Sequence, residues 1–153
     1  MNKDKQKIGL GIEPSELDDL NRKTSGKILG LDYGSKNVGI AISDREQKQA
    51  FVYETLNFNH DFFKKLKQII KDELIDKIVV GLPLSMSGKY SRKTEEVVQF
   101  IELVEKQTKL IVETVDERMS TIEAKKRKDG HQIDASSAQI ILQQYLDSPE
   151  IGD

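Results

Sequence analysis

The chain has 153 residues, enough for one domain with a substantial core, and 33% of them are charged. Its formal net charge of −2 predicts no general attraction to nucleic acid, and the absence of cysteine excludes disulfides, thiolate metal sites and thiol nucleophiles. No stretch is long and apolar enough to span a membrane, and residues 1–26 lack the hydrophobic core of a signal peptide. We therefore expect a cytoplasmic protein in which carboxylates are the available metal ligands.

The chain is expected to consist of an extension, one domain and a short tail. Residues 1–26 show no sustained hydrophobic period, apart from a possible short helix after Pro14, and we expect them to be flexible. The regular pattern that follows predicts one domain over residues 27–147, and residues 148–153 form a C-terminal tail.

The first part of this domain predicts three antiparallel strands. Apolar residues with a high strand propensity occupy residues 27–32 and 38–43, and a turn with glycine, serine and asparagine joins them at residues 33–37. A third β-rich stretch lies near residues 50–56. The short connections predict an antiparallel meander.

Helices and strands alternate in the rest of the domain. Asn59 is positioned to cap a helix whose apolar residues recur every three or four positions up to Leu74. An apolar run at residues 77–82, ended by Pro83, is typical of a buried parallel strand, and an amphipathic helix is expected at residues 94–106.

The last elements predict a recognisable fold class. A strand is expected at residues 110–115, a helix follows the capping-box sequence at residues 120–123, and a final helix begins near Asp134. The resulting order β-β-β-α-β-α-β-α-α is that of the ribonuclease H-like α/β fold. We therefore expect a mixed five-stranded sheet, three antiparallel strands followed by two parallel ones, flanked by helices.

Acidic residues occur at the ends of these elements. Asp32 ends the first strand, Asp116 and Glu117 follow the last strand, and Asp134 lies at the start of the final helix. Such ends can converge, and a few carboxylates can hold two divalent ions that catalyse hydrolysis of a phosphodiester bond. Oxygen ligands suit Mg²⁺, or Mn²⁺ in its place.

Each of these acids also has a purely structural interpretation. Asp32 could bond the backbone of the following turn, and Asp134 could be an ordinary helix N-cap. Strand alternation sends Asp116 and Glu117 to opposite faces, so one of them is expected to reach the metal cluster, and the spacing does not choose between them. The other could form a surface salt bridge with Arg118.

Local basic patches can attract nucleic acid despite the negative net charge. The run at residues 125–128 is the strongest of these patches, although such a run is equally consistent with a solvated helix face. A loop with serine and glycine after Pro83 could line a phosphate groove. The candidate nucleic-acid-binding residues are Lys36, Ser87, Lys89, Arg118, Lys125, Lys126, Arg127 and Lys128.

Four motifs in order resemble the YqgF/RuvX family over about residues 27–147. They are Leu31-Asp32-Tyr33-Gly34-Ser35-Lys36 with Val38-Gly39-Ile40-Ala41, Val80-Gly81-Leu82-Pro83-Leu84 with Gly88, Asp116-Glu117-Arg118-Met119-Ser120-Thr121, and Asp134-Ala135-Ser136-Ser137-Ala138 with Ile140-Ile141-Leu142. Members of this family are described as pre-16S ribosomal RNA nucleases and as Holliday-junction-resolvase-like proteins.

The resemblance implies a metal-dependent nuclease, and thus a hydrolase, that matures the 5′ end of 16S ribosomal RNA. By motif, Asp32, Glu117 and Asp134 match the catalytic, metal-binding acids, and Asp116 is a lesser candidate. The implied partner is precursor 16S rRNA or the pre-30S particle, bound by a monomer or a homodimer.

Three other functions stay open. A resolvase of branched DNA would use the same acids. A non-catalytic RNA-binding assembly factor would retain the scaffold without turnover. An actin-like ATPase shares the Asp-x-Gly-Ser loop after its first strand, but it clamps nucleotide between two such domains, and this chain supplies one.

Overall fold

The computed structural model describes residues 26–85, 87–118 and 134–148. Its centre is a five-stranded sheet with the order β4-β3-β2-β5-β6. The strands are β2 (Lys27–Tyr33), β3 (Asn37–Ser43), β4 (Ala50–Asn57), β5 (Ile75–Leu84) and β6 (Ile111–Arg118). The helices are α2 (Phe62–Glu73), α3 (Arg92–Thr108) and α5 (Asp134–Asp147).

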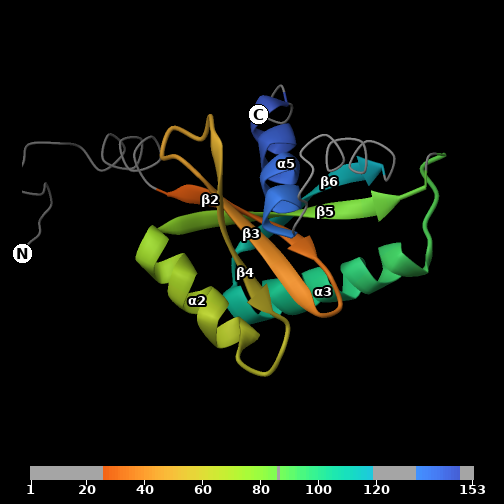
Figure 1. Cartoon of the computed structure of the whole chain (residues 1–153), viewed down its shortest axis with the longest axis horizontal. Helices are drawn as coiled ribbons and strands as arrows, with labels where there is room; N and C mark the ends of the chain where they lie inside the picture. The colour runs from red at the N-terminus through yellow and green to blue at the C-terminus, as the bar shows by residue number, and fades with distance from the viewer. Residues whose placement is uncertain (1–25, 86, 119–133, 149–153) are drawn as a thin grey trace, which may run out of the picture.

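The sheet has the expected mixed topology. Strand β3 pairs antiparallel with both β2 and β4, whereas β5 pairs parallel with β2 and with β6. The arrowheads of β5 and β6 point the same way in Figure 1. The prediction of three antiparallel strands followed by two parallel strands is therefore confirmed.

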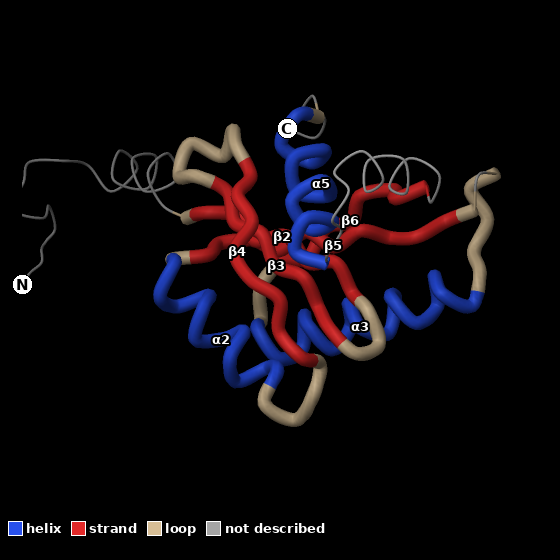
Figure 2. Tube along the Cα trace, viewed as in Figure 1, coloured by secondary structure: helices blue, strands red, loops and turns tan. Residues whose placement is uncertain are grey.

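Helices cover both faces of the sheet. Helices α2 and α3 lie on one face and α5 lies on the other, as Figures 1 and 2 show. Successive side chains along each strand point to opposite faces of the sheet. Leu29 and Leu31 of β2 pack on the α2 and α3 side, whereas Ile28 packs with Ala138 and Leu142 of α5.

Two local predictions were wrong in detail. Helix α2 begins at Phe62 with Asp61 as its N-cap, because the side chain of Asn59 instead accepts a hydrogen bond from the backbone N–H of Asp61, at 3.0 Å. Strand β5 runs through Pro83, which the sequence analysis took as its end. The pairing of β5 with β2 stops at Val80, so a residue without an N–H is tolerated beyond that point.

Some predictions fall outside the described residues. These are the extension up to residue 25, the helix after the capping box at residues 120–123, and the basic run at residues 125–128. No helix within the described ranges has both the length and the apolar character needed to cross a membrane.

Candidate active site

Asp32 lies at the carboxyl end of the central strand. It follows Leu31, which pairs with Val80 of β5, and it pairs with Gly39 of β3 on its other side. Strand alternation places Asp32 on the same face as Gly30, the face that α5 covers. The side chain of Asp32 is half-buried.

The two adjacent acids of β6 face opposite sides of the sheet, as strand alternation predicted. Val115 packs with the residues beneath α5, so Glu117, two positions further along, faces the same side. Glu117 is 8% exposed, whereas Asp116 is exposed on the other face. The structure thus brings Glu117, and not Asp116, to the face that carries Asp32.

Glu117 leans across β5 toward Asp32. A Cβ atom built on Gly81 would lie 2.5 Å from Oε1 of Glu117, so the carboxylate rests directly on the Gly81 backbone. Gly81 is one residue beyond Val80, which pairs with Leu31, so Gly81 and Asp32 lie at the same level of neighbouring strands. Neighbouring strands are about 5 Å apart, which brings two carboxylates from distant parts of the sequence into one region.

Helix α5 begins at Asp134 and points its first turn toward this region. Tyr145, near the end of the helix, bonds Lys77 and Glu113, which lie near the starts of β5 and β6. One turn earlier, Ile141 packs on Gly81, closer to the carboxyl ends of the same strands. Asp134, the third predicted acid, lies two helical turns before Ile141, so its backbone lies toward the carboxyl ends of the strands. Its side chain is not among those described.

Tyr33 anchors the backbone next to Asp32. Its ring lies 4.5 Å from that of Phe100 in α3 and 5.4 Å from that of Phe58, measured between centroids. Burial, together with the negative charge of Glu96, raises the pKa of the Tyr33 hydroxyl above its ordinary value. The tyrosine therefore stays neutral and packed at neutral pH.

Two loops at the same end of the sheet carry predicted nucleic-acid contacts. Lys36 is exposed in the turn between β2 and β3, and Ser87 and Lys89 are exposed in the loop after β5. Backbone and side-chain bonds hold this second loop: the N–H of Lys89 donates to Oγ of Ser85 at 3.0 Å, and the N–H of Ser85 donates to the carbonyl of Lys89 at 3.1 Å.

The remaining predicted contacts are less defined. Arg118 ends β6, but its side chain is not among those described. The structure does not describe Lys125, Lys126, Arg127 and Lys128.

The donors at this site suit a hard divalent cation. Carboxylates are the ligands that such ions prefer, and Glu117 is a largely buried one. The Oγ atom of Ser137 in the first turn of α5 is fully buried and has no hydrogen-bond partner within the described chain. Among the described side chains, which exclude that of Asp134, no three acidic or histidine groups already form a metal cluster.

Sequence reasoning missed two contributors to this geometry. Gly81 and Ser137 were each quoted only within a motif. The signal for Gly81 was a glycine inside an apolar strand, which often marks close approach of another group.

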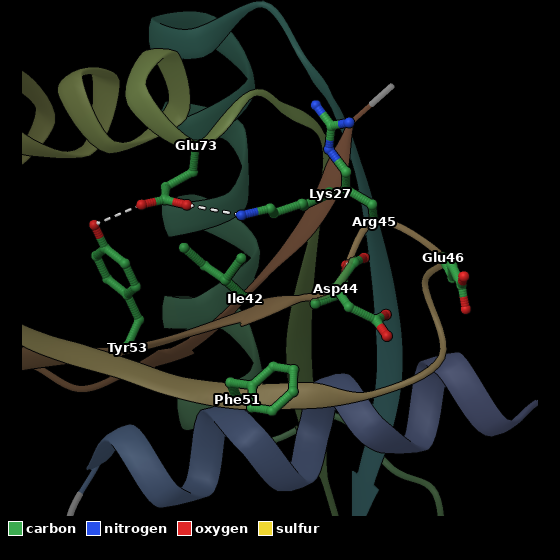
Figure 3. Close-up of a pocket in the computed structure, with 9 residues that line it drawn as sticks. Lys27, Ile42, Asp44, Arg45, Glu46, Phe51, Tyr53 and Glu73 are labelled. Atoms are coloured by element: carbon green, nitrogen blue, oxygen red, sulfur yellow. Dashed lines mark hydrogen bonds and ion pairs between the residues drawn. The ribbon is translucent and has the colours of Figure 1, made fainter. Parts of the chain in front are cut away.

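A separate pocket of about 720 Å³ lies at the other end of the sheet (Figure 3). Lys27 at the start of β2 donates to Glu73 at 2.9 Å, and the hydroxyl of Tyr53 donates to the same carboxylate at 3.3 Å. Phe51 is 53% exposed beside them. This pocket is remote from the acids because Lys27 and Asp32 lie near opposite ends of one strand.

The chain is similar to known proteins over most of its length. A family model described as "RuvX: Holliday junction resolvase" matches residues 26–148. A protein of Maridesulfovibrio salexigens named "Putative pre-16S rRNA nuclease" is 37% identical over 78% of this chain and 97% of its own length. A protein of the same name from Clostridioides difficile is 39% identical over 80% of this chain and 94% of its own.

A solved structure shows the same fold. The RuvC structure of Thermus thermophilus aligns with a TM-score of 0.50 at 10% identity, covering 78% of this chain and 93% of that one. The ribonuclease H-like fold expected from the element order is thereby confirmed. The family match over most of the chain, together with relatives at nearly 40% identity, shows that the chain belongs to the RuvX family of nucleases.

Proposed function

We propose that the chain hydrolyses phosphodiester bonds of precursor 16S rRNA, free or within a pre-30S particle, with divalent cations held by Asp32, Glu117 and Asp134. The observation that supports it best is the position of the Glu117 carboxylate on Gly81, one strand from Asp32 and on the same face. Carboxylate oxygens are the ligands that Mg²⁺ and Mn²⁺ prefer, so two carboxylates on one face of the sheet can hold such a cation.

The chain's own residues have distinct tasks in this proposal. When bound, the cation activates water and stabilises the charge that develops on the phosphate. Asp32 and Glu117 fix its place on the sheet, and Asp134 approaches from α5. Lys36, Ser87 and Lys89 contact the phosphates on either side of the cleaved bond. Ile141 of α5 shares the space over Gly81 with the carboxylate.

The substrate part of the proposal draws on the names of the relatives. Proteins that match this chain over nearly their whole length are named for pre-16S rRNA. We place the protein in the cytoplasm. Asp116 faces away from the cluster and is assigned no catalytic role.

Cleavage of branched DNA is a second candidate. It is favoured by the description of the matching family model as a Holliday junction resolvase. A resolvase cuts two strands of one junction, so this function calls for a dimer with two sites. The same acids would act in both reactions.

Parallel assays on two substrates test the proposal. Wild-type protein and the Asp32→Asn variant are incubated with a precursor 16S rRNA fragment and with a four-way DNA junction, each with MgCl₂, MnCl₂ or EDTA. We expect metal-dependent cleavage of the RNA, lost in the variant. Metal-dependent cleavage of the junction alone assigns the second function, and metal-independent or variant-insensitive cleavage overturns both.

A binding role gives a different result. If Asp32→Asn leaves rRNA processing unchanged while Lys125→Ala or Lys126→Ala abolishes RNA association, the chain is a non-catalytic assembly factor.

A further inference from the structure

Ser137 is the one fully buried side chain of the described residues whose polar atom lacks a hydrogen-bond partner. A buried hydroxyl without a partner costs free energy, and such groups in native proteins call for an explanation such as an ion, a water or a catalytic role. The other buried serine, Ser43, shows the usual arrangement. It accepts from the N–H of Ile28 at 2.9 Å and donates to the carbonyl of Asp44 at 2.8 Å.

The position of Ser137 links it to the carboxylates. It precedes Ile141 by one helical turn, so the two side chains lie on the same side of α5. Ile141 and the Glu117 carboxylate share the surface of Gly81: a Cβ there would lie 2.6 Å from Cδ1 of Ile141 and 2.5 Å from Oε1 of Glu117. Moving one turn from Ile141 toward the start of α5 leads toward the carboxyl ends of the strands, where Asp32 lies.

The neighbouring residue, Ala138, shows how closely this part of α5 approaches the sheet. Ala138 has its carbonyl oxygen 3.3 Å from where a Cβ on Gly30 would be, so this turn of α5 rests on the strand that carries Asp32. Gly30 and Asp32 face the same side of β2. Ser137 therefore belongs to the turn of α5 that rests on β2, one turn nearer than Ile141 to the start of the helix.

From this geometry we propose that Ser137 is a positioning residue for the cation site. Its hydroxyl donates to a carboxylate of the cluster, or accepts from the hydration shell of the cation, when the site is loaded. The chemistry supports this role because Mg²⁺ keeps several of its waters in proteins, and groups that bond the ligands set their orientation. The inference rests on the proposed function, since it assigns a task at the same site.

The role predicts opposite effects of one substitution in two states. Ser137→Ala removes a hydroxyl that is unsatisfied without metal, so the Tm of the metal-free protein should stay equal or rise. In MgCl₂ the same variant should show a smaller rise in Tm than the wild type. The MgCl₂ concentration that gives half of the effect should increase about tenfold. Ser137→Thr retains the hydroxyl and should restore the wild-type response.

The controls separate this role from a structural one. Ser43→Ala removes a hydroxyl whose bonds are already made, so its Tm should fall equally with and without MgCl₂. Asp32→Asn should abolish the MgCl₂ response altogether. In cleavage assays Ser137→Ala should lower kcat at a fixed, limiting MgCl₂ concentration and leave KM for the nucleic acid unchanged.

The outcomes are distinguishable. If wild type responds to MgCl₂, Asp32→Asn abolishes the response and Ser137→Ala retains it in full, the role of Ser137 is refuted and the proposed function stands. If Ser137→Ala lowers Tm equally in both conditions, the hydroxyl is structural. If the wild type itself shows no response, the cation site is refuted together with this inference.

Discussion

Glu117 and Gly81 are in direct contact, with the carboxylate oxygen of one occupying the space that a side chain on the other would need. Adding a methyl group at Gly81 would bring it within 2.5 Å of Oε1 of Glu117 and 2.6 Å of Cδ1 of Ile141. The glycine thus allows an acid from β6 to lie over β5, close to Asp32. The site depends on the absence of a side chain as much as on the acids.

Gly81→Ala is therefore expected to displace the carboxylate. Overpacking of this kind costs about 1–3 kcal/mol of stability, and misplacing a catalytic group by about 1 Å can cost about 100-fold in rate. Urea denaturation and metal-dependent cleavage of the rRNA fragment measure the two effects.

A second substitution separates packing from chemistry. Ile141→Val removes the Cδ1 atom, so Gly81→Ala with Ile141→Val should regain part of the lost stability while cleavage stays low. Recovery of cleavage in the double variant would show that the position of Glu117 is not what limits activity.

Tyr33 is expected to hold Asp32 through its ring and not through its hydroxyl. Tyr33→Phe keeps the contacts with Phe58 and Phe100 and should leave stability and cleavage nearly unchanged. Tyr33→Ala removes a half-buried aromatic ring and should lower the free energy of unfolding by about 2 kcal/mol, with reduced cleavage per folded molecule. A large loss of activity in Tyr33→Phe would instead assign the hydroxyl a direct role.

The C-terminal part of α5 is held by a polar network whose contribution to stability should fall at alkaline pH. Lys77 donates to the hydroxyl of Tyr145 at 2.9 Å and lies 3.3 Å from a carboxylate oxygen of Glu113. Burial alone would lower the pKa of Lys77, but the bond to Tyr145 and the charge of Glu113 outweigh it and raise the pKa above the ordinary value of 10.5. Because the pKa of Lys77 is higher in the folded protein, the stabilisation is complete at pH values below the pKa of the unfolded state. It is lost as the pH rises through the pKa of the folded state.

Lys77→Met tests this network. At pH 7 the variant should be less stable by about 0.5–1 kcal/mol, a modest value because both partners are partly exposed. The difference from wild type should shrink above pH 10.5 as the lysine of the wild type loses its proton. A difference that is constant from pH 7 to pH 12 would contradict the assigned charge state.

Lys89 is expected to contact a phosphate. Lys89→Ala should weaken nucleic-acid binding similarly for all sequences and reduce the slope of log K against log salt by about 0.7–0.9. Lys67→Ala, an exposed lysine of α2 on the other face of the sheet, is the matched control and should leave the slope unchanged. Equal effects of the two variants would show only a general influence of charge.

Strand periodicity was sufficient to predict that Asp116 and Glu117 face opposite sides, but not which of them meets Asp32. That choice depends on the registers of β5 with β2 and with β6, together with the side on which α5 packs. These are relationships between segments that lie far apart in the sequence. A local pattern therefore carries no information about them.

Helix starts show a similar limit. Asn59 has the right chemistry for a cap, yet its side chain closes a turn with Asp61, and α2 begins after it. For α3, the sequence analysis placed the start at Thr94, whereas Ser91 is the cap and Thr94 completes a capping box from inside the helix. Several residues near a helix start can cap it, and tertiary packing selects among them.

The pair of adjacent acids on β6 offers the most direct test of the proposed site. Glu117→Gln and Asp116→Asn each remove one negative charge from neighbouring residues, and only the first lies on the face that carries Asp32. The measurement is the rate of MgCl₂-dependent cleavage of a precursor 16S rRNA fragment by the two variants. The account predicts that Glu117→Gln loses cleavage by about 100-fold or more while Asp116→Asn cleaves within about threefold of wild type. Full activity in Glu117→Gln, or loss confined to Asp116→Asn, would contradict it.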